Sequence, residues 1–197
     1  MMMDSFVIQV IKVAVALFII TDSIGNLPIF MGLTDGLAKG ERRKLFNTAL
    51  LTGLVLLAAF GFAGALVFSL FDLTIEDLKI AGGVLLFLIA VEVLLRGKVV
   101  FEHKEDIGVV PMGCPLMVGP GAITTVLVML KIYDFYAVLA GTAVCFFIIW
   151  LILFFSESIY RFLGRNGALI ITKISAILIA AIAVRFIRQG VMAILGL

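Results

Sequence analysis

The sequence "DSIGNLPIF" occupies residues 22–30, inside one of the most apolar stretches of the chain. It places an ionisable carboxylate, a glycine, an asparagine and a proline together where a buried helix would favour leucine. Proline removes an amide donor and clashes with the preceding turn, and glycine adds backbone freedom. We therefore expect the helix that contains this stretch to be interrupted here.

The composition is typical of an integral membrane protein. Of the 197 residues, 63% are hydrophobic and 14% are charged, and the mean hydropathy is +1.27. Soluble domains have about half apolar and about a quarter charged residues. Several windows hold more than about 18 nearly uncharged residues, enough to cross a ~30 Å hydrocarbon layer. We expect one multi-pass transmembrane domain over residues 1–197, in the cell (inner) membrane.

Six apolar segments indicate an all-α protein with six transmembrane helices. In order, they cover about residues 6–34, 45–71, 77–95, 109–130, 135–159 and 168–195. An even number of spans places both termini on the same side of the membrane. The net charge of +2 is small, and the basic residues flank the apolar segments, so the sequence gives no indication of a nucleic-acid partner.

The distribution of basic residues predicts the orientation. Ten of the fifteen lie in or beside the loops after the first, third and fifth segments, and these are Lys39, Arg42, Arg43, Lys44, Arg96, Lys98, Lys104, Arg161, Arg165 and Lys173. Basic residues are retained on the cytoplasmic side. We therefore expect both termini to be non-cytoplasmic, and the loop at about 97–108 to be cytoplasmic.

A second interruption is expected in the fourth segment, at "CPLMVGPGAITT" (residues 114–125). Pro115, Gly119, Pro120 and Gly121 together cannot continue a regular helix. Inside lipid, irregular backbone persists only where it is buried in protein or lines a wet cavity. The alternative is an ordinary proline kink, in which neighbouring helices satisfy the freed backbone groups.

The two interruptions recur at one spacing along the chain. Gly25 and Gly119 are 94 residues apart, and "IAVEVLLRG" (89–97) and "IAVRFIRQG" (182–190) are 93 apart. An odd number of spans per copy inverts the second copy. We predict two inverted three-helix repeats, at about 5–97 and 109–197, with the first and fourth helices discontinuous. Paired discontinuous helices of this kind form midplane binding sites in secondary transporters.

Three motifs resemble the MarC family of membrane proteins, which includes the SnatA-type transporters of small neutral amino acids. They are "DSIGNLPIF", "IAGGVLLFLIA" (80–90) and "PLMVGPGAITTVLVM" (115–129), and the resemblance covers the whole chain in length, span number and motif order. It implies a six-span transporter of glycine, alanine and similar amino acids, for which proton or ion coupling has been proposed. The family's motif residues fall here on Asp22, Gly25, Asn26, Pro28, Pro115, Gly119, Pro120 and Gly121.

Two positions depart from the family pattern. Ser23 stands where the family usually has a proline, and Arg185 where it often has a neutral polar residue. The substrate and the coupling ion of this protein can therefore differ from those of better-known family members. Coupling to protons or to a monovalent cation, and assembly into a homo-oligomer, are both compatible with the sequence.

The residues at the two breaks suit an amino-acid zwitterion. A helix that begins at Pro120 would present the amides of Gly121 and Ala122, and the positive end of a helix dipole favours a carboxylate. Pro28 has the corresponding place in the first span. Carbonyls before each break, with Asp22 or Asn26, would accept the ammonium protons. The predicted substrate-binding residues are Thr21, Asp22, Ser23, Gly25, Asn26, Pro28, Gly119, Pro120, Gly121, Ala122, Thr124 and Thr125.

Asp22 is the first candidate for coupling or gating. A carboxylate near the middle of the bilayer costs at least ~2.5 kcal/mol. Such a group holds a cation, relays a proton, or caps the following helix segment by accepting amide protons. Glu92 and Arg185 occupy equivalent positions in the two repeats. Because the second repeat is inverted, Glu92 is expected near the cytoplasmic side of the membrane and Arg185 near the outer side, so they are not expected to form an ion pair. Each is expected to extend to its nearest interface, or else to line a gate.

The sequence indicates no enzyme, metal or cofactor. His103 is the only histidine and lies in a charged loop, and Cys114 and Cys145 lie in apolar sequence, where we expect unpaired thiols. The spans contain no serine–histidine pair and no phosphate loop. The alternative function is an ion channel or ion-binding protein, which would use the same breaks as a ring of carbonyls with Asp22.

Overall fold

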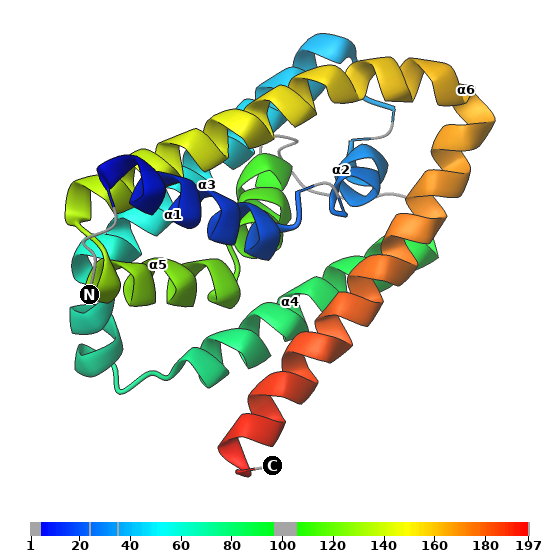
Figure 1. The fold of residues 1–197 in the computed structure, drawn as a ribbon. Coiled ribbons are helices and arrows are strands. Elements are labelled where there is room, and N and C mark those ends of the chain that lie inside the picture. Colours follow the sequence, from blue (N-terminus) through cyan, green and yellow to red (C-terminus); the bar gives the residue numbers. More distant parts are fainter. Residues whose placement is uncertain (1–4, 24, 35, 97–105, 197) are drawn as a thin grey trace.

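The computed structural model describes residues 5–23, 25–34, 36–96 and 106–196, and within them the chain is helical with no strand. The elements in chain order are α1 (Phe6–Thr21), α2 (Leu27–Leu33), α3 (Lys39–Leu70), α4 (Ile75–Arg96), the irregular helical segment η1 (Gly108–Met117), α5 (Pro120–Ile132) and α6 (Phe135–Ile194) (Figure 1). The predicted all-α class is confirmed. The predicted loop at 97–108, with Lys98, His103 and Lys104, lies mostly outside the described residues.

Four helical segments in the described part are long and apolar enough to cross a membrane: Lys39–Gly64, Ile75–Leu95, Phe135–Ser156 and Lys173–Ile194. Together, η1 and α5 form a fifth candidate, bent by 58° at the break between them. The predicted first span is divided into α1, with 16 residues, and α2, with 7 residues. Four to five candidate spans are therefore present, and the sixth stays a prediction.

The last two predicted spans lie in one helix, α6, which runs without interruption for 60 residues. The loop expected between them, at about residues 160–167, is instead helical. This stretch, "YRFLGRNG", contains glycines but no proline, and an isolated glycine costs a helix only about 1 kcal/mol. Figure 1 shows that α6 curves, so that its first half runs with α1 and α3 while its second half lies beside α4.

The packing of α4 against the second half of α6 depends on two glycines. A Cβ atom at Gly83 would lie 2.8 Å from the carbonyl oxygen of Ala183, and one at Gly190 would lie 2.9 Å from that of Glu76. Both distances are too short for a side chain, so the helices approach to backbone contact. Small residues are the usual means of close helix packing in membranes.

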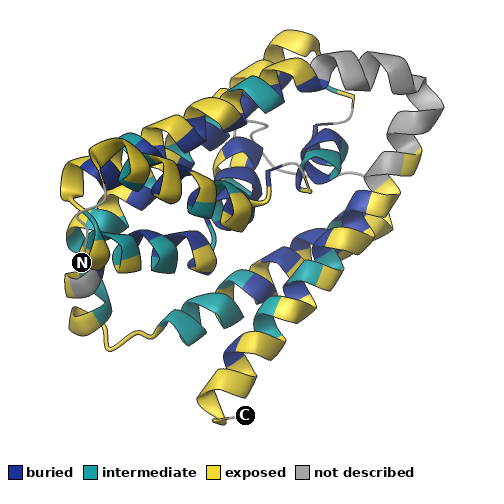
Figure 2. Cartoon of the chain, viewed as in Figure 1, coloured by how far each residue is buried: buried dark blue, intermediate teal, exposed yellow. Residues whose placement is uncertain are grey.

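The interior of the bundle holds η1 and α2, with α1, α3 and α6 around them, and α5 runs beside α1 at the edge of the bundle (Figure 1). Large side chains such as Leu17, Phe30, Met117 and Ile149 are fully buried there. The outer faces are apolar and exposed, as Figure 2 shows in yellow, and Leu95 is 81% exposed. Apolar residues on the outside suit contact with lipid rather than water.

Small residues also set the distance between α3 and its neighbours. The stretch "GFAGALVF" (61–68) packs closely against α5, because a Cβ at Gly64 would lie 3.2 Å from the Leu127 side chain. Further along α3, Thr52 packs against Gly113 of η1, where a Cβ would lie 2.9 Å from the threonine Cβ. This packing holds the irregular segment against α3.

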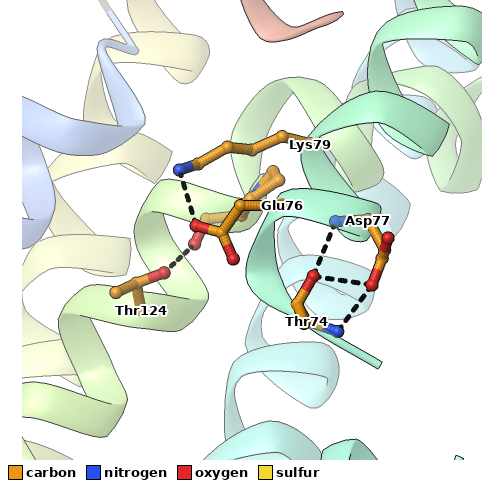
Figure 3. Close-up of polar contacts among 6 residues, drawn as sticks. Thr74, Glu76, Asp77, Lys79 and Thr124 are labelled. Atoms are coloured by element: carbon orange, nitrogen blue, oxygen red, sulfur yellow. Dashed lines mark hydrogen bonds and ion pairs between the residues drawn. The ribbon is translucent and has the colours of Figure 1, made fainter. Parts of the chain in front are cut away.

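A capping box starts α4. The Asp77 carboxylate accepts hydrogen bonds from the Thr74 amide (2.8 Å) and hydroxyl (2.6 Å), and the Asp77 amide donates to the Thr74 hydroxyl (3.2 Å) (Figure 3). These bonds satisfy amides that the helix itself leaves unpaired.

Removing the capping hydroxyl is expected to destabilise the protein modestly. Thr74→Ala should lower the melting temperature of the detergent-solubilised protein by about 2–4 °C, and Thr74→Ser should restore it. Lys79→Ala is the control, because it breaks only the 3.6 Å Lys79–Glu76 ion pair nearby and should change the temperature less. Equal effects of the two alanine variants would contradict a special role for the cap.

Candidate functional site

The first helix break lies between Thr21 and Leu27, where the sequence predicts an interruption. Asp22 ends α1 with a left-handed backbone (φ 41°, ψ 47°), a conformation that aspartate and asparagine adopt more readily than other residues with a Cβ. One oxygen of its exposed carboxylate accepts a hydrogen bond from the Gly25 amide at 3.3 Å. The carboxylate therefore organises the turn that links α1 to α2.

Gly25 lies directly against that carboxylate. A Cβ atom here would lie 2.5 Å from Oδ2 of Asp22, which is shorter than any normal contact. The aspartate and the glycine three residues later thus form one steric unit. A side chain at position 25 would force the Asp22 carboxylate to move from its hydrogen bond with the Gly25 amide.

The second break begins earlier than the sequence predicts. Within η1, the backbone is extended at Val110 and at Cys114, and each is followed by a cis bond to proline. Gly119 then caps α5, which begins at Pro120 as expected. The irregular backbone therefore covers residues 110–119, whereas Thr124 and Thr125 lie within regular helix.

Gly119 sits where a side chain has no room. A Cβ atom would lie 2.8 Å from the carbonyl oxygen of Pro115, whereas one at Gly82 of α4 would lie 3.6 Å from the Pro115 Cβ. We expect Gly119→Ala to lower the free energy of unfolding by about 1–3 kcal/mol, because the break must open to admit the methyl group.

Gly82→Ala is a matched control on the other side of Pro115, with an ordinary van der Waals contact. It should change stability by less than about 0.5 kcal/mol. Thermal or denaturant unfolding of both variants in the same detergent measures the difference. A tolerated Gly119→Ala would mean that the tight approach to the Pro115 carbonyl is not needed for the fold.

The two breaks contact each other through Asn26. Its side-chain amide donates to the carbonyl of Thr21 at 3.0 Å and to the carbonyl of Leu116 at 3.2 Å, and the residue is 6% exposed. Leu116 belongs to η1, 90 residues along the chain. The buried Asn26 amide therefore donates hydrogen bonds to one carbonyl from each of the two breaks. The sequence contains no signal for Leu116 as a partner of Asn26.

The predicted hydroxyl groups are engaged in local hydrogen bonds. Thr124 donates to the Pro120 carbonyl at 2.7 Å (Figure 3), and Thr125 donates to the Gly121 carbonyl at 2.8 Å. At the first break, Ser23 is buried and donates to the Thr21 hydroxyl at 3.4 Å. The hydroxyl hydrogen of each of these residues is thus already donated to a protein acceptor. The hydroxyl oxygens can still accept a hydrogen bond from a ligand.

The start of α5 differs in detail from the prediction. The amides of Ala122 and Ile123 both donate to the Gly119 carbonyl, at 3.0 and 3.2 Å. The Ala122 amide is therefore already paired within the first turn and is not directed at a ligand. A Cβ at Gly121 would lie 3.3 Å from the Ile20 side chain, which shows how closely α5 starts beside the end of α1.

Further residues complete the surroundings of the breaks. Pro28 lies in the first turn of α2, and its carbonyl accepts a hydrogen bond from the buried hydroxyl of Ser175 on α6. Ser175 was missed, because nothing in its local sequence links it to α2. Glu92 is half-buried on α4 and Arg185 is exposed on α6, so both belong to the α4–α6 pair rather than to the Asn26 contact.

Among the described residues, no group of three or more histidine, cysteine, aspartate or glutamate side chains is arranged to hold a metal ion. Both cysteines are free; Cys145 is fully buried and Cys114 is partly exposed.

The long apolar helices and the apolar exterior define an integral, multi-pass membrane protein. Residues 7–195 match the MarC family of integral membrane proteins, and the chain belongs to this family.

Its relatives cover nearly the whole chain. It is 35% identical over 205 residues to the UPF0056 membrane protein YvbG of Bacillus subtilis, covering 96% of this chain and 95% of that protein. It is 37% identical over 187 residues to a UPF0056 membrane protein of Archaeoglobus fulgidus, covering 88% of each. The UPF0056 membrane protein YhcE of Escherichia coli is 29% identical over 198 residues. No solved structure matches the chain.

Proposed function

We propose that this MarC-family protein is a secondary transporter of small neutral amino acids, such as glycine and alanine, and that it works by alternating access around the two helix breaks. The observation that carries the proposal is the Asn26 side chain, which joins the carbonyl of Thr21 to that of Leu116. Irregular backbone from distant parts of the chain meets inside the protein. In secondary transporters, such meeting points bind substrate and coupling ions.

The proposal includes the inverted repeat. In it, α1 with α2, and η1 with α5, are the discontinuous first and fourth spans of two three-helix copies. The starts of α2 and α5, at Leu27 and Pro120, are 93 residues apart and each has a proline in its first turn, which supports the pairing. Both termini are then on the non-cytoplasmic side of the cell membrane.

In this mechanism, the substrate binds beside the contact between the breaks. The exposed carboxylate of Asp22 attracts the ammonium group of the amino acid, or the coupling proton or monovalent cation. The first turn of α5 supplies the positive end of a helix dipole for the substrate carboxylate. Rearrangement of the two copies about the site then exposes it to either side.

Uptake by proteoliposomes tests the proposal. Purified protein should take up labelled glycine and alanine with saturation, and internal unlabelled amino acid should accelerate entry by counterflow. Imposing a pH gradient in each direction shows whether protons are coupled. A channel built on the same breaks would give neither saturation nor counterflow. Absence of flux for every neutral amino acid, with correctly folded protein, would contradict the proposal.

A further inference from the structure

An apolar cavity of about 230 Å³ adjoins the second break. Side chains of α3 and α4 form one side of it, and Cys114, Pro115, Gly119 and Pro120 form the other. Every lining residue is apolar or a cysteine. A cavity with such walls offers no hydrogen-bond partner to water and is suited to a hydrocarbon group.

The size of the cavity restricts what it can hold. An apolar protein cavity of about 150 Å³ binds benzene, which has six carbon atoms. The present cavity is open on one side, and its volume has room for a side chain of four to six carbons. Gly82 lines this space, and a Cβ atom there would meet only Pro115, at an ordinary contact distance of 3.6 Å.

The cavity adjoins the start of α5, which also takes part in the proposed substrate site. Gly119 and Pro120 line the cavity, and they are also the cap and the first residue of α5. An amino acid whose carboxylate lies at the start of this helix would therefore be able to place its side chain in the cavity. Glycine and alanine would leave most of the apolar space empty.

We propose that this cavity is the side-chain subsite of the transporter, and that it favours neutral amino acids with branched aliphatic side chains, namely valine, leucine and isoleucine, over glycine. The inference rests on the proposed function and names the substrate class of the same site. Each methylene group accepted by an apolar pocket improves discrimination by roughly 10–200-fold. Leucine should therefore compete at concentrations at least about ten-fold lower than glycine.

Competition for alanine uptake tests the preference. Unlabelled leucine should inhibit the uptake of labelled alanine at least about ten-fold more strongly than glycine does. Gly82→Leu fills the cavity and should bring inhibition by leucine down to the level of inhibition by glycine, whereas Gly82→Ala should retain the advantage of leucine. Equal inhibition of the wild-type protein by leucine and glycine, or an equal loss of all uptake in Gly82→Leu with normal uptake in Gly82→Ala, would overturn the subsite. Absence of any amino-acid uptake would instead count against the proposed function.

Labelling of Cys114 tests the subsite without transport. In nanodiscs, N-ethylmaleimide should modify Cys114, and the fully buried Cys145 should remain unreactive, with Cys114→Ser as the control for residual labelling. Leucine should slow the modification at concentrations at which glycine has no effect. No protection by leucine would overturn the proposal, as would protection by palmitate alone, which would identify the occupant as a lipid chain.

Discussion

Replacing Asp22 with asparagine is expected to reduce amino-acid transport by about 10–100-fold and to leave the folded protein intact. Asparagine tolerates the left-handed backbone at this position (φ 41°) and keeps an oxygen that can accept the Gly25 hydrogen bond. Only the negative charge is lost. A hydrogen bond to a charged group contributes about 1.5–3 kcal/mol, which corresponds to the expected range.

The matched control is Asp72→Asn. Asp72 is the other described aspartate with a left-handed backbone (φ 51°), and it lies in the turn between α3 and α4, away from the breaks. This variant should transport normally. Initial uptake rates in proteoliposomes, normalised to folded protein, measure both. Wild-type flux in Asp22→Asn would assign the carboxylate a purely structural role in the turn.

Replacing Asn26 with alanine is expected to have the largest effect on stability. The substitution leaves the buried carbonyls of Thr21 and Leu116 without the amide that joins them. Each buried polar group left unsatisfied costs about 1–3 kcal/mol. We expect the free energy of unfolding to fall by about 2–4 kcal/mol, and transport to be lost because the two breaks separate.

Asn47→Ala provides the comparison for this second prediction. Asn47 is an exposed asparagine on α3, so its replacement should change stability by less than about 0.5 kcal/mol. Denaturant unfolding in detergent, followed by tryptophan fluorescence of the single Trp150, measures both variants. Equal effects would show that the Asn26 side chain does not hold the breaks together.

Several features were predictable because their causes are local. The end of α1 at Thr21 and the start of α5 at Pro120 follow from what glycine and proline do to a backbone. The expected loop at about residues 160–167 was wrong for a related reason: glycines there permit a break but do not force one.

The roles of individual polar groups were harder to predict. The Ala122 amide and the hydroxyls of Thr124 and Thr125 were expected to face a ligand, but each is paired with a carbonyl near the start of α5. The residue type determines which hydrogen-bond donors and acceptors a side chain has. Which partner each group binds depends on the three-dimensional arrangement, which the sequence does not state.

The sequence by itself determined that this protein is a helical membrane protein and that glycine and proline interrupt its apolar segments near residues 25 and 119. The hydrophobicity of a span and the effects of glycine and proline on the backbone depend only on residues close together in the chain, so they can be predicted from the sequence. Only the tertiary structure decided that Asn26 meets Leu116, that Ser175 reaches the Pro28 carbonyl, and that Gly82 leaves an apolar cavity beside α5. These are contacts between distant segments, and they exist only after the helices have packed.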